Sequence, residues 1–278
     1  MPEMPEVETI CRSLETYLTG RRIDRVEVLL PRQIKWPSAE EFAARVEGEK
    51  ILNVKRRAKY ILLELTGGST LIVHLRMTGR LVYHADAPTT AKHDRLIFRL
   101  DNGAALVYAD TRTLGAIYCL RLGEESRVKG LQTLGPEPLS AEFTPEFLKN
   151  ICAAKHRKIK PALLDQSFIA GLGNIYADEA LFLAGIHPLR TTDSLTAREI
   201  EELHRAVNEV IAAGIKDGGT TFRDYQNAEG QKGSHQDHLF VYQKDGEPCQ
   251  KCGQTIERMV IGGRSAHFCP GCQRGETL

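Results

Sequence analysis

The chain has 278 residues, of which 42% are hydrophobic and 26% are charged, and its formal net charge is +1. These values are typical of a globular protein with two domains, or with one domain and an appendage. No apolar run approaches the roughly 18 residues that span a bilayer, and the acidic start excludes a signal peptide, so we expect a cytoplasmic protein with no membrane partner.

The N-terminal stretch MPEMPEVETI predicts a helix that begins almost at the first residue. Pro5 suits the first turn of this helix, and Gly20 lies just beyond its end. Apolar side chains recur at helical spacing between them; these are Val7, Ile10, Cys11, Leu14 and Leu18. Three glutamates also crowd this start, and two of them, Glu6 and Glu8, suit the positive end of a helix dipole.

That dipole does not account for Pro2 and Glu3, which precede the helix. Removal of Met1 would expose Pro2 as a secondary amine. An α-amino group has a reference pKa of roughly 7.7 to 8, so a neutral, nucleophilic fraction exists near pH 7. An amine of this kind can attack an electrophilic carbon and form an iminium, as catalytic lysines do with carbonyl groups.

Short runs rich in β-branched residues follow, and turn sequences such as TGGS and DNG separate them. The expected strands occupy residues 23–30, 60–65, 70–75, 95–100, 104–109 and 115–120. They predict an antiparallel sandwich that a helix near residues 40–46 interrupts. The stretch LGPEPLS, residues 134–140, then reads as a hinge, because the pattern beyond it becomes helical.

The second half predicts helices and one long polar loop. The helices are expected at residues 145–153, 159–166, 175–184 and, after a capping box formed by Thr196 and Glu199, along a long segment that follows. Asn174 is the expected N-cap of the third helix. The glycine turn before Asn174 either binds a DNA phosphate or serves only as a capped helical hairpin. The glycine-rich loop at 218–237 is functional or disordered, and a strand is expected at 238–243.

Two clusters of positive charge, at residues 50–59 and 155–160, remain open to two interpretations. Each is either a solvated face or a phosphate-binding surface. A near-neutral chain can bind nucleic acid when its basic residues share one surface, so the net charge does not decide between them.

The cysteines indicate a metal site at the C-terminus. Four of the seven form the pairs CQKC and CPGC, with sixteen residues between the pairs; they are Cys249, Cys252, Cys269 and Cys272. This spacing favours one tetrahedral zinc ion, which is structural because four sulfurs leave no position for water. Two disulfides are a poor alternative in a cytoplasmic protein. The other three, Cys11, Cys119 and Cys152, are expected to be buried thiols.

Several motifs occur together in the order found in one enzyme family. They are PEMPEVET, RRAKYILLEL, HLRMTGRL, LGPEPL, LLDQSFIAGLGNIYADEALF, TTFRDY and the cysteine-rich C-terminus with GGRSAHFCPGCQR. The chain thereby resembles, over its whole length, the bacterial formamidopyrimidine-DNA glycosylases, which are base-excision repair enzymes for oxidised purines.

The resemblance implies an α+β fold in four parts. An N-terminal helix and an antiparallel β-sandwich would form a catalytic domain at residues 1–134, followed by a linker at 135–140. A helix-two-turn-helix DNA-binding domain with a lesion loop would occupy 141–237. A zinc-finger β-hairpin with four cysteine ligands would occupy 238–278.

The resemblance also implies a reaction. Pro2 would displace the damaged base from C1′ and form a Schiff base, while Glu3 would exchange a proton at the sugar ring oxygen and Glu6 would hold the terminus. Strand cleavage by β- and then δ-elimination would follow, which is lyase activity at an abasic site. Lys59, close to the catalytic pocket, and Arg264, in the zinc hairpin, complete the expected catalytic set.

Double-stranded DNA containing oxidised purines is the implied partner of a monomeric protein. Lys59, His74, Asn174 and Arg264 would contact phosphates, because the damaged nucleotide must be flipped out of the helix at a cost of a few kcal/mol. The remaining expected DNA-binding residues are Met77, His93, Arg112, Leu114, Arg223 and Tyr225.

The sequence departs from the family at one of these positions. Met77 and Arg112 match two of the three side chains that fill the vacated space, but Thr113 and Leu114 stand where the family usually has a basic residue and a phenylalanine. Leucine can still act as a wedge between bases. We therefore expect retained activity with weaker intercalation or an altered preference for the opposite base.

Three other functions remain as alternatives. Endonuclease VIII uses the same architecture on oxidised pyrimidines, although its usual opening is PEGPEI rather than PEMPEVE. A DNA-binding relative without catalytic activity would keep the scaffold and the zinc, but Pro2, Glu3 and Lys59 are intact here. A zinc hydrolase is the most distant alternative, because the sequence shows no open site with three ligands.

Overall fold

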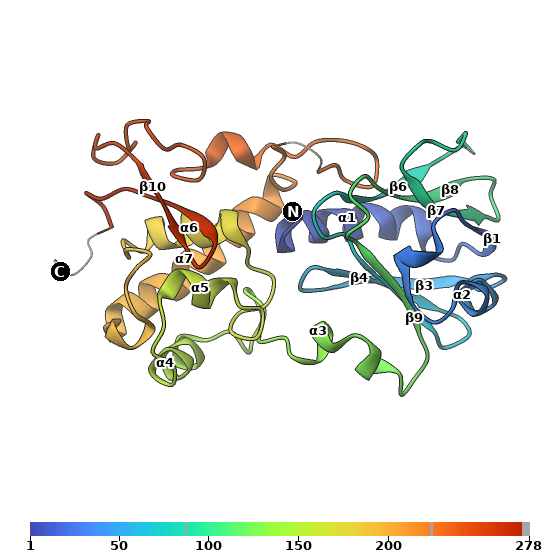
Figure 1. The fold of residues 1–278 in the computed structure, drawn as a ribbon, viewed down its shortest axis with the longest axis horizontal. Coiled ribbons are helices and arrows are strands. Elements are labelled where there is room, and N and C mark those ends of the chain that lie inside the picture. The colour runs from blue at the N-terminus through green and yellow to red at the C-terminus, as the bar shows by residue number, and fades with distance from the viewer. Residues whose placement is uncertain (87, 223–224, 274–278) are drawn as a thin grey trace. The chain divides into compact units, whose positions relative to one another are not determined.

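The computed structural model describes residues 1–278 except residues 87, 223–224 and 274–278 (Figure 1). The chain forms two compact units. The first comprises Met1–Gln132 with Asp217–Gln236, and the second comprises Thr133–Lys216 with Asp237–Leu278. The helical domain was expected to continue to residue 237, but the segment Asp217–Gln236 packs within the first unit.

The first unit contains two β-sheets. One sheet has the strand order β1-β7-β8-β6 and the other has the order β2-β9-β5-β4-β3. The strands are β1 (Ile23–Val28), β2 (Ile34–Trp36), β3 (Ile51–Arg57), β4 (Tyr60–Leu65), β5 (Thr70–His74), β6 (Gly79–His84), β7 (Asp94–Leu100), β8 (Ala105–Asp110) and β9 (Ala116–Leu120). The helices of this unit are α1 (Met4–Leu18), α2 (Ala39–Val46) and α3 (Lys129–Gln132), with 3-10 turns at η1 (Pro31–Gln33) and η2 (Glu125–Arg127).

This arrangement confirms the predicted sandwich with one exception. Every ladder in the two sheets is antiparallel except that of β2 with β9, which is parallel. Apolar side chains of both sheets and of α1 share one core, which includes Leu14 of α1, Leu63 of β4 and Phe98 of β7. Helix α1 ends where the sequence predicts, because Gly20 follows with a φ of 81°.

Three strands were not predicted, namely β2, β3 and β6. Strand β3 coincides with the basic cluster at residues 50–59 and buries only Ile51 and Val54. It is an edge strand paired only with β4, and charged side chains are common on exposed edges. Its two buried residues lie three positions apart, so no alternation of apolar and polar residues marked it as a strand.

The second unit is built from helices and a hairpin. Its elements are α4 (Pro145–Ala153), α5 (Ile159–Leu164), α6 (Asn174–Leu183), η3 (Thr192–Ser194), α7 (Ala197–Lys216), η4 (His235–His238, which begins in the first unit), β10 (Glu257–Ile261) and β11 (Arg264–Phe268). Helix α6 packs against α5, α7 and β11, and it buries all its residues from Ile175 to Phe182. The capping box before α7 is confirmed, since the Glu199 backbone N–H donates to Thr196 Oγ1 over 3.2 Å and the Thr196 N–H donates to Glu199 Oε2 over 2.8 Å.

Two local predictions are wrong. Asn174 is not the N-cap of α6, because Gly173 occupies that position and Asn174 is the first helical residue. Residues 239–243 form no strand. The reason is that the buried carboxylate of Glu179 on α6 accepts the backbone N–H groups of residues 240, 241 and 242 over 2.7 to 2.9 Å, which removes the donors that a strand ladder needs.

Among the residues that the structure describes, no helix combines the length and the apolar character needed to cross a membrane.

Candidate active site and nucleic-acid interface

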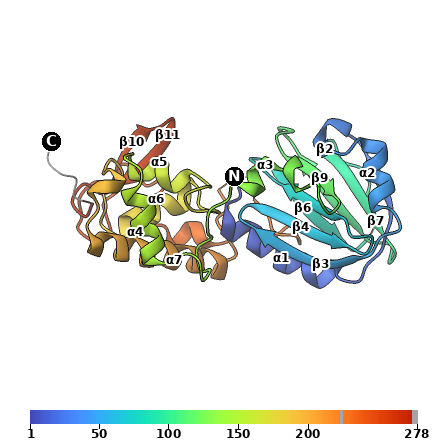
Figure 2. The same ribbon diagram turned by 90° about the horizontal axis from the view of Figure 1, so that it is seen from below.

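The N-terminal proline and glutamate lie against the first unit rather than projecting from it. Pro2 is buried, and Glu3 is only 3% exposed, immediately before α1. The backbone N–H of Glu3 donates to Glu6 Oε2 over 2.7 Å, so the first turn of the helix binds the residue next to Pro2. Helix α1 itself packs on β3 and β4 (Figure 2). The terminus is therefore held in a defined place.

The carboxylate of Glu6 also binds the segment that returns from the C-terminal half of the chain. The Thr220 backbone N–H donates to Glu6 Oε1 over 2.7 Å. A Cβ at Gly219, where φ is 85°, would lie 2.9 Å from Glu6 Cγ, so only glycine allows this approach. Buried Tyr225 donates its hydroxyl to the Gly218 carbonyl over 2.9 Å. Glu6 thus joins the terminus to this segment, a contact across 214 residues that no local sequence signal reveals.

Glu8 has a different role from Glu3 and Glu6. It binds Arg12 and Arg56 at 2.8 and 2.7 Å. Partial burial acts to raise the pKa of Glu8, but the hydrogen bonds from Arg56 and Arg12 outweigh it and lower the pKa. Glu8 is therefore a structural ion-pair residue.

Lys59 and His74 lie at the same end of the neighbouring strands β4 and β5 of the five-stranded sheet. Lys59 occupies the turn between β3 and β4, and His74 ends β5 opposite Tyr60. Burial lowers the pKa of His74 to about 3, and the charges of Arg76 and Lys59 contribute. The ring is therefore neutral near pH 7. Because His74 Nδ1 accepts the Arg76 backbone N–H over 3.0 Å, the ring proton is on Nε2, where it can be donated to an oxygen.

Met77 and Arg112 lie at the same end of one strand pair. Met77 precedes β6 and Arg112 follows β8, and these antiparallel strands pair Gly79 with Asp110. Met77 is 40% exposed and Leu114 is 49% exposed, which are large fractions for apolar side chains. The structure therefore presents two apolar side chains and one cation on adjacent loops, which we name the Met77 loop (residues 75–79) and the Arg112 loop (residues 111–115).

The remaining expected DNA-binding residues of this unit differ in position. His93 lies just before β7, and its Nδ1 is 3.3 Å from Arg95 Nη2. Tyr225 is buried against the Glu6 region, as described above. Arg223 lies outside the described residues.

In the second unit, Asn174 and the zinc hairpin are bound to each other. Asn174 Nδ2 donates to Ser265 Oγ over 3.2 Å, and Ser265 is the neighbour of Arg264 on β11. Beneath them the buried Lys160 ammonium pairs with Asp178, and it donates to the Ser265 carbonyl over 3.3 Å. Arg264 itself is exposed at the start of β11. Asn174 and Arg264 are thus presented by one hydrogen-bonded group.

Lys160 belongs to the basic cluster at residues 155–160, which the sequence left open between a solvated face and a phosphate-binding surface. It has no solvent-exposed side-chain area, so it belongs to the core of the second unit rather than to a solvated face. A buried ammonium requires a paired carboxylate, and Asp178 supplies it.

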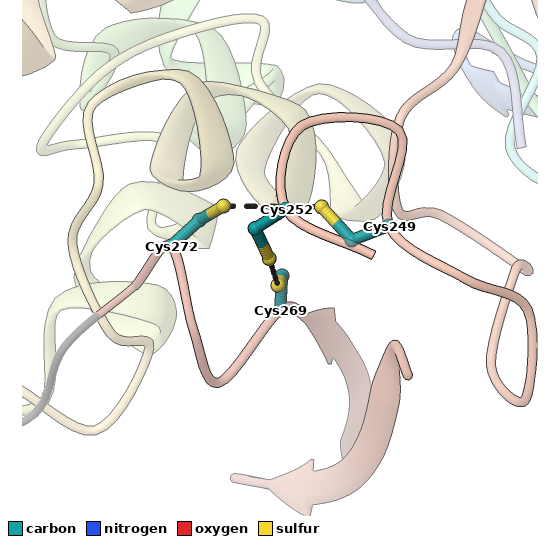
Figure 3. Close-up of side chains that lie close together, drawn as sticks. All are labelled: Cys249, Cys252, Cys269 and Cys272. Carbon is teal, nitrogen blue, oxygen red and sulfur yellow. Dashed lines mark hydrogen bonds between the residues drawn. The ribbon is translucent and has the colours of Figure 1, made fainter. Parts of the chain in front are cut away.

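The four cysteines converge at one point of the second unit (Figure 3). Their sulfurs all lie within 4.8 Å of one another, with Cys249 Sγ 3.8 Å from Cys272 Sγ and Cys252 Sγ 3.4 Å from Cys269 Sγ. These distances exclude S–S bonds of about 2 Å. They fit a tetrahedron of sulfurs at about 2.3 Å from zinc, whose edges are about 3.8 Å.

The pKa values of the cysteine thiols also bear on whether the four sulfurs need a bound cation. Burial and the neighbouring sulfurs raise the pKa of Cys272 to about 12. In spite of burial, backbone hydrogen bonds from Cys252 and Lys251 lower the pKa of Cys249 to about 7. Four ionised thiolates this close together require a bound cation, and four sulfur ligands would hold a structural zinc ion with no position left for a substrate. Zinc fixes the hairpin that carries Arg264.

Three family descriptions match the chain in succession. Residues 1–117 match the formamidopyrimidine-DNA glycosylase N-terminal domain, residues 134–226 match the H2TH domain of the same glycosylase, and residues 246–275 match the zinc finger found in FPG and IleRS. A sandwich with a buried N-terminal proline, a helical unit and a four-cysteine hairpin in this order define a zinc-finger DNA glycosylase.

Relatives over the full length specify the family. A formamidopyrimidine-DNA glycosylase of Pelotomaculum thermopropionicum is 50% identical over 99% of both chains, and one of Bacillus cereus is 45% identical over 98% of this chain and 99% of that protein. The chain belongs to the formamidopyrimidine-DNA glycosylase family, a family of base-excision repair enzymes.

Solved structures agree with this assignment. The structure of a Lactococcus lactis FPG mutant with DNA containing Fapy-dG has a TM-score of 0.92 and 36% sequence identity to this chain. The match covers 99% of this chain and 100% of that chain. A structure of MutM with DNA containing carbocyclic 8-oxo-G has a TM-score of 0.91 and 36% identity over 99% of this chain and 100% of that chain. The α+β fold, the helix-two-turn-helix unit and the zinc finger are thus confirmed.

Proposed function

We propose that this protein excises oxidised purines, such as 8-oxoguanine and formamidopyrimidines, from double-stranded DNA and then cleaves the strand at the abasic site. The observation that carries the proposal is the buried Pro2–Glu3 terminus, held by hydrogen bonds of Glu6 to Glu3 and Thr220. A disordered terminus would lose the effective concentration that an intramolecular attack requires. The DNA complexes of the Lactococcus lactis relative support the substrate class.

The chemistry follows from an amine at the terminus. Once Met1 is removed, the neutral Pro2 nitrogen attacks C1′, the C1′–base bond breaks, and the base leaves with a proton. Glu3 protonates the ring oxygen as the sugar opens to an iminium. The iminium acidifies a C2′ proton, so elimination expels the 3′ phosphate and a second elimination expels the 5′ phosphate. Hydrolysis finally releases the sugar fragment from Pro2.

Each unit also supplies groups suited to phosphate oxygens. In the first unit, Lys59 supplies a cation and neutral His74 supplies an Nε2–H donor. In the second unit, Asn174 is the first residue of α6 and Arg264 begins β11 after the Gly262–Gly263 turn. Helix N-termini and arginines are frequent phosphate ligands. We propose that these four residues bind the DNA backbone.

Borohydride trapping on a duplex with 8-oxoguanine opposite cytosine tests the reaction. Protein with a free Pro2, verified by mass spectrometry, should form a covalent adduct. The matched control is the same sequence with Met1 retained, which blocks the amine but keeps every side chain. Pro2→Gly should also trap much less. Absence of an adduct from correctly trimmed protein would leave only a DNA-binding relative, which gives a salt-sensitive mobility shift.

Oxidised pyrimidines are a second candidate substrate. One structure of the wild-type Lactococcus lactis protein, with a TM-score of 0.91, contains DNA with an oxidised pyrimidine. The same trapping assay with an oxidised pyrimidine in the duplex distinguishes the two. We expect more adduct with the purine lesion, and the reverse order would favour an endonuclease VIII type of specificity.

A further inference from the structure

A buried carboxylate with no role in the proposed chemistry lies beneath the Met77 and Arg112 loops. Asp110, the last residue of β8, is 1% exposed and accepts hydrogen bonds from five donors. A carboxylate has about four lone-pair positions, so its acceptor capacity is fully used. The identity of those donors indicates what Asp110 does.

Its first oxygen joins the two loops. Asp110 Oδ1 accepts from Thr78 Oγ1 over 2.6 Å and from the Arg112 backbone N–H over 3.2 Å. The Arg112 N–H also lies 3.1 Å from Thr78 Oγ1, so it is shared between the two acceptors. Thr78 is the neighbour of Met77. One triangle of hydrogen bonds therefore connects the backbone of the Arg112 loop to the side chain beside Met77.

Its second oxygen closes the Arg112 loop and connects it to the interior of the sandwich. Asp110 Oδ2 accepts from the Gly115 backbone N–H over 2.8 Å, from Gln33 Nε2 over 3.2 Å and from the Tyr108 hydroxyl over 3.3 Å. Gln33 Nε2 also donates to the Gly115 carbonyl over 2.8 Å. Two residues of the Arg112 loop, 112 and 115, are therefore bound to one side chain.

The Tyr108 hydroxyl supports both loops from below. A Cβ at Gly79, in the Met77 loop, would lie 2.9 Å from this oxygen, and a Cβ at Gly115 would lie 1.8 Å from it. Glycine at both positions thus lets the two loops close over a shared support. Burial and the nearby Asp110 raise the pKa of Tyr108, so the hydroxyl remains a donor.

The Arg112 loop needs this support because its backbone is strained. Thr113 has a φ of 54°, a conformation that β-branched residues rarely adopt. Arg32 Nη2 donates to its hydroxyl over 3.1 Å, and the Asp110 bonds lie on either side of it. Without these bonds the loop would relax, and the positions of Arg112 and Leu114 would change.

We infer that Asp110 is a positioning residue that fixes the spacing between Met77 on one loop and Arg112 and Leu114 on the other, and thereby sets the enzyme's discrimination of the base opposite the lesion. This inference rests on the proposed function and on the expectation, implied by the family resemblance, that those three side chains fill the space left by the flipped nucleotide. It assigns to Asp110 no contact with DNA and no part in the attack by Pro2.

Three variants separate positioning from folding and from chemistry. In Asp110→Asn, one acceptor oxygen becomes an NH2 group, so two or three of the five hydrogen bonds lose their acceptor, depending on which way the amide turns. Thr78→Val keeps the side-chain shape but removes the hydroxyl that joins the loops. Thr78→Ser keeps the hydroxyl and is the matched control. All three leave Pro2, Glu3 and Arg112 in place.

The measurement is the ratio of single-turnover excision rates for a lesion opposite cytosine and opposite adenine. We expect Asp110→Asn and Thr78→Val to lower this ratio by roughly fivefold, the size of one lost hydrogen bond, and Thr78→Ser to preserve it. Borohydride trapping on a single-stranded abasic oligonucleotide, which needs the amine but no opposite base, should stay within about twofold of wild type for all three.

The inference is overturned if the ratio stays at its wild-type value in both Asp110→Asn and Thr78→Val, or if wild type itself shows no discrimination. It is also overturned if single-stranded trapping falls in parallel with the ratio, since Asp110 would then act on the fold or the chemistry. Failure of the proposed function has another signature, namely a wild-type protein that traps no substrate.

Discussion

The side chains of the N-terminal helix show how neighbouring residues of one type acquire different functions. Glu3 is buried beside Pro2, Glu6 hydrogen-bonds two backbone N–H groups, and Glu8 pairs with two arginines. The sequence singled out Pro2 and Glu3 because the helix dipole did not account for them, and the family resemblance implied their reactive roles. It could not predict the partners of Glu6, because Thr220 lies 214 positions away.

His74 makes the stability of the protein sensitive to acid. Its pKa is lowered to about 3 by burial and by Arg76 and Lys59, against roughly 6.5 in the unfolded chain. Between these values the unfolded state binds the extra proton, so unfolding becomes easier as pH falls below about 6.5, by up to ~1.4 kcal/mol per pH unit.

Replacement of this ring by an uncharged amide tests the point. We expect His74→Gln to show a shallower loss of unfolding free energy between pH 6 and pH 4, measured by urea denaturation, even if it is less stable at pH 7. An unchanged slope would show that other groups take up the proton. The neutral ring also implies that DNA affinity should not depend on His74 ionisation between pH 6 and 8.

Leu114 offers less surface for stacking than the phenylalanine usual in the family, yet it is 49% exposed. We expect Leu114→Phe to tighten binding to a duplex with an abasic-site analogue by several-fold, because an aromatic ring stacks on a base for about 1–3 kcal/mol. Fluorescence anisotropy measures this. Leu114→Ala should weaken binding, and equal affinity of all three proteins would remove any role for this side chain as a wedge.

Whether a segment becomes a strand or a helix depends on where its backbone N–H and C=O groups find hydrogen-bond partners as much as on its side-chain pattern. Residues 238–243 have the composition of a strand, but Glu179 accepts three successive N–H groups of this segment. Strand β3 is the opposite case: its charged composition did not predict a strand, but the structure contains one at the edge of the sheet. In contrast, α4, α7 and the zinc hairpin were predictable, because capping residues, apolar periodicity and cysteine spacing are local signals.

Glu179→Gln tests whether this carboxylate holds the backbone of residues 240–242 in its non-strand conformation. The amide keeps one acceptor oxygen, so one or two of the three N–H groups lose their partner, at a cost of about 1–3 kcal/mol each. We expect faster hydrogen exchange at residues 240–242 and a lower urea midpoint, with little change at α1. Unaltered protection of these amides would mean that they have other acceptors.

At the scale of the molecule, the zinc site and the N-terminal site belong to different compact units. We expect Cys249→Ser to lose zinc and to weaken DNA binding, while single-stranded trapping by Pro2 persists in part. Cys152→Ala, which alters a buried thiol in α4 that is not a ligand, is the matched control and should retain zinc. Zinc content, DNA affinity and adduct yield are the measurements, and full affinity without zinc would contradict the role given to the hairpin.

The segment Asp217–Gln236 has a further consequence for how the chain can be divided. The polypeptide passes from one unit to the other at residues 132–133, 216–217 and 236–237. A fragment ending at residue 132 would lack the Thr220 amide that covers the Glu6 carboxylate. No single cut can therefore release an intact sandwich, and a protease nick in the hinge should leave both products associated under native conditions.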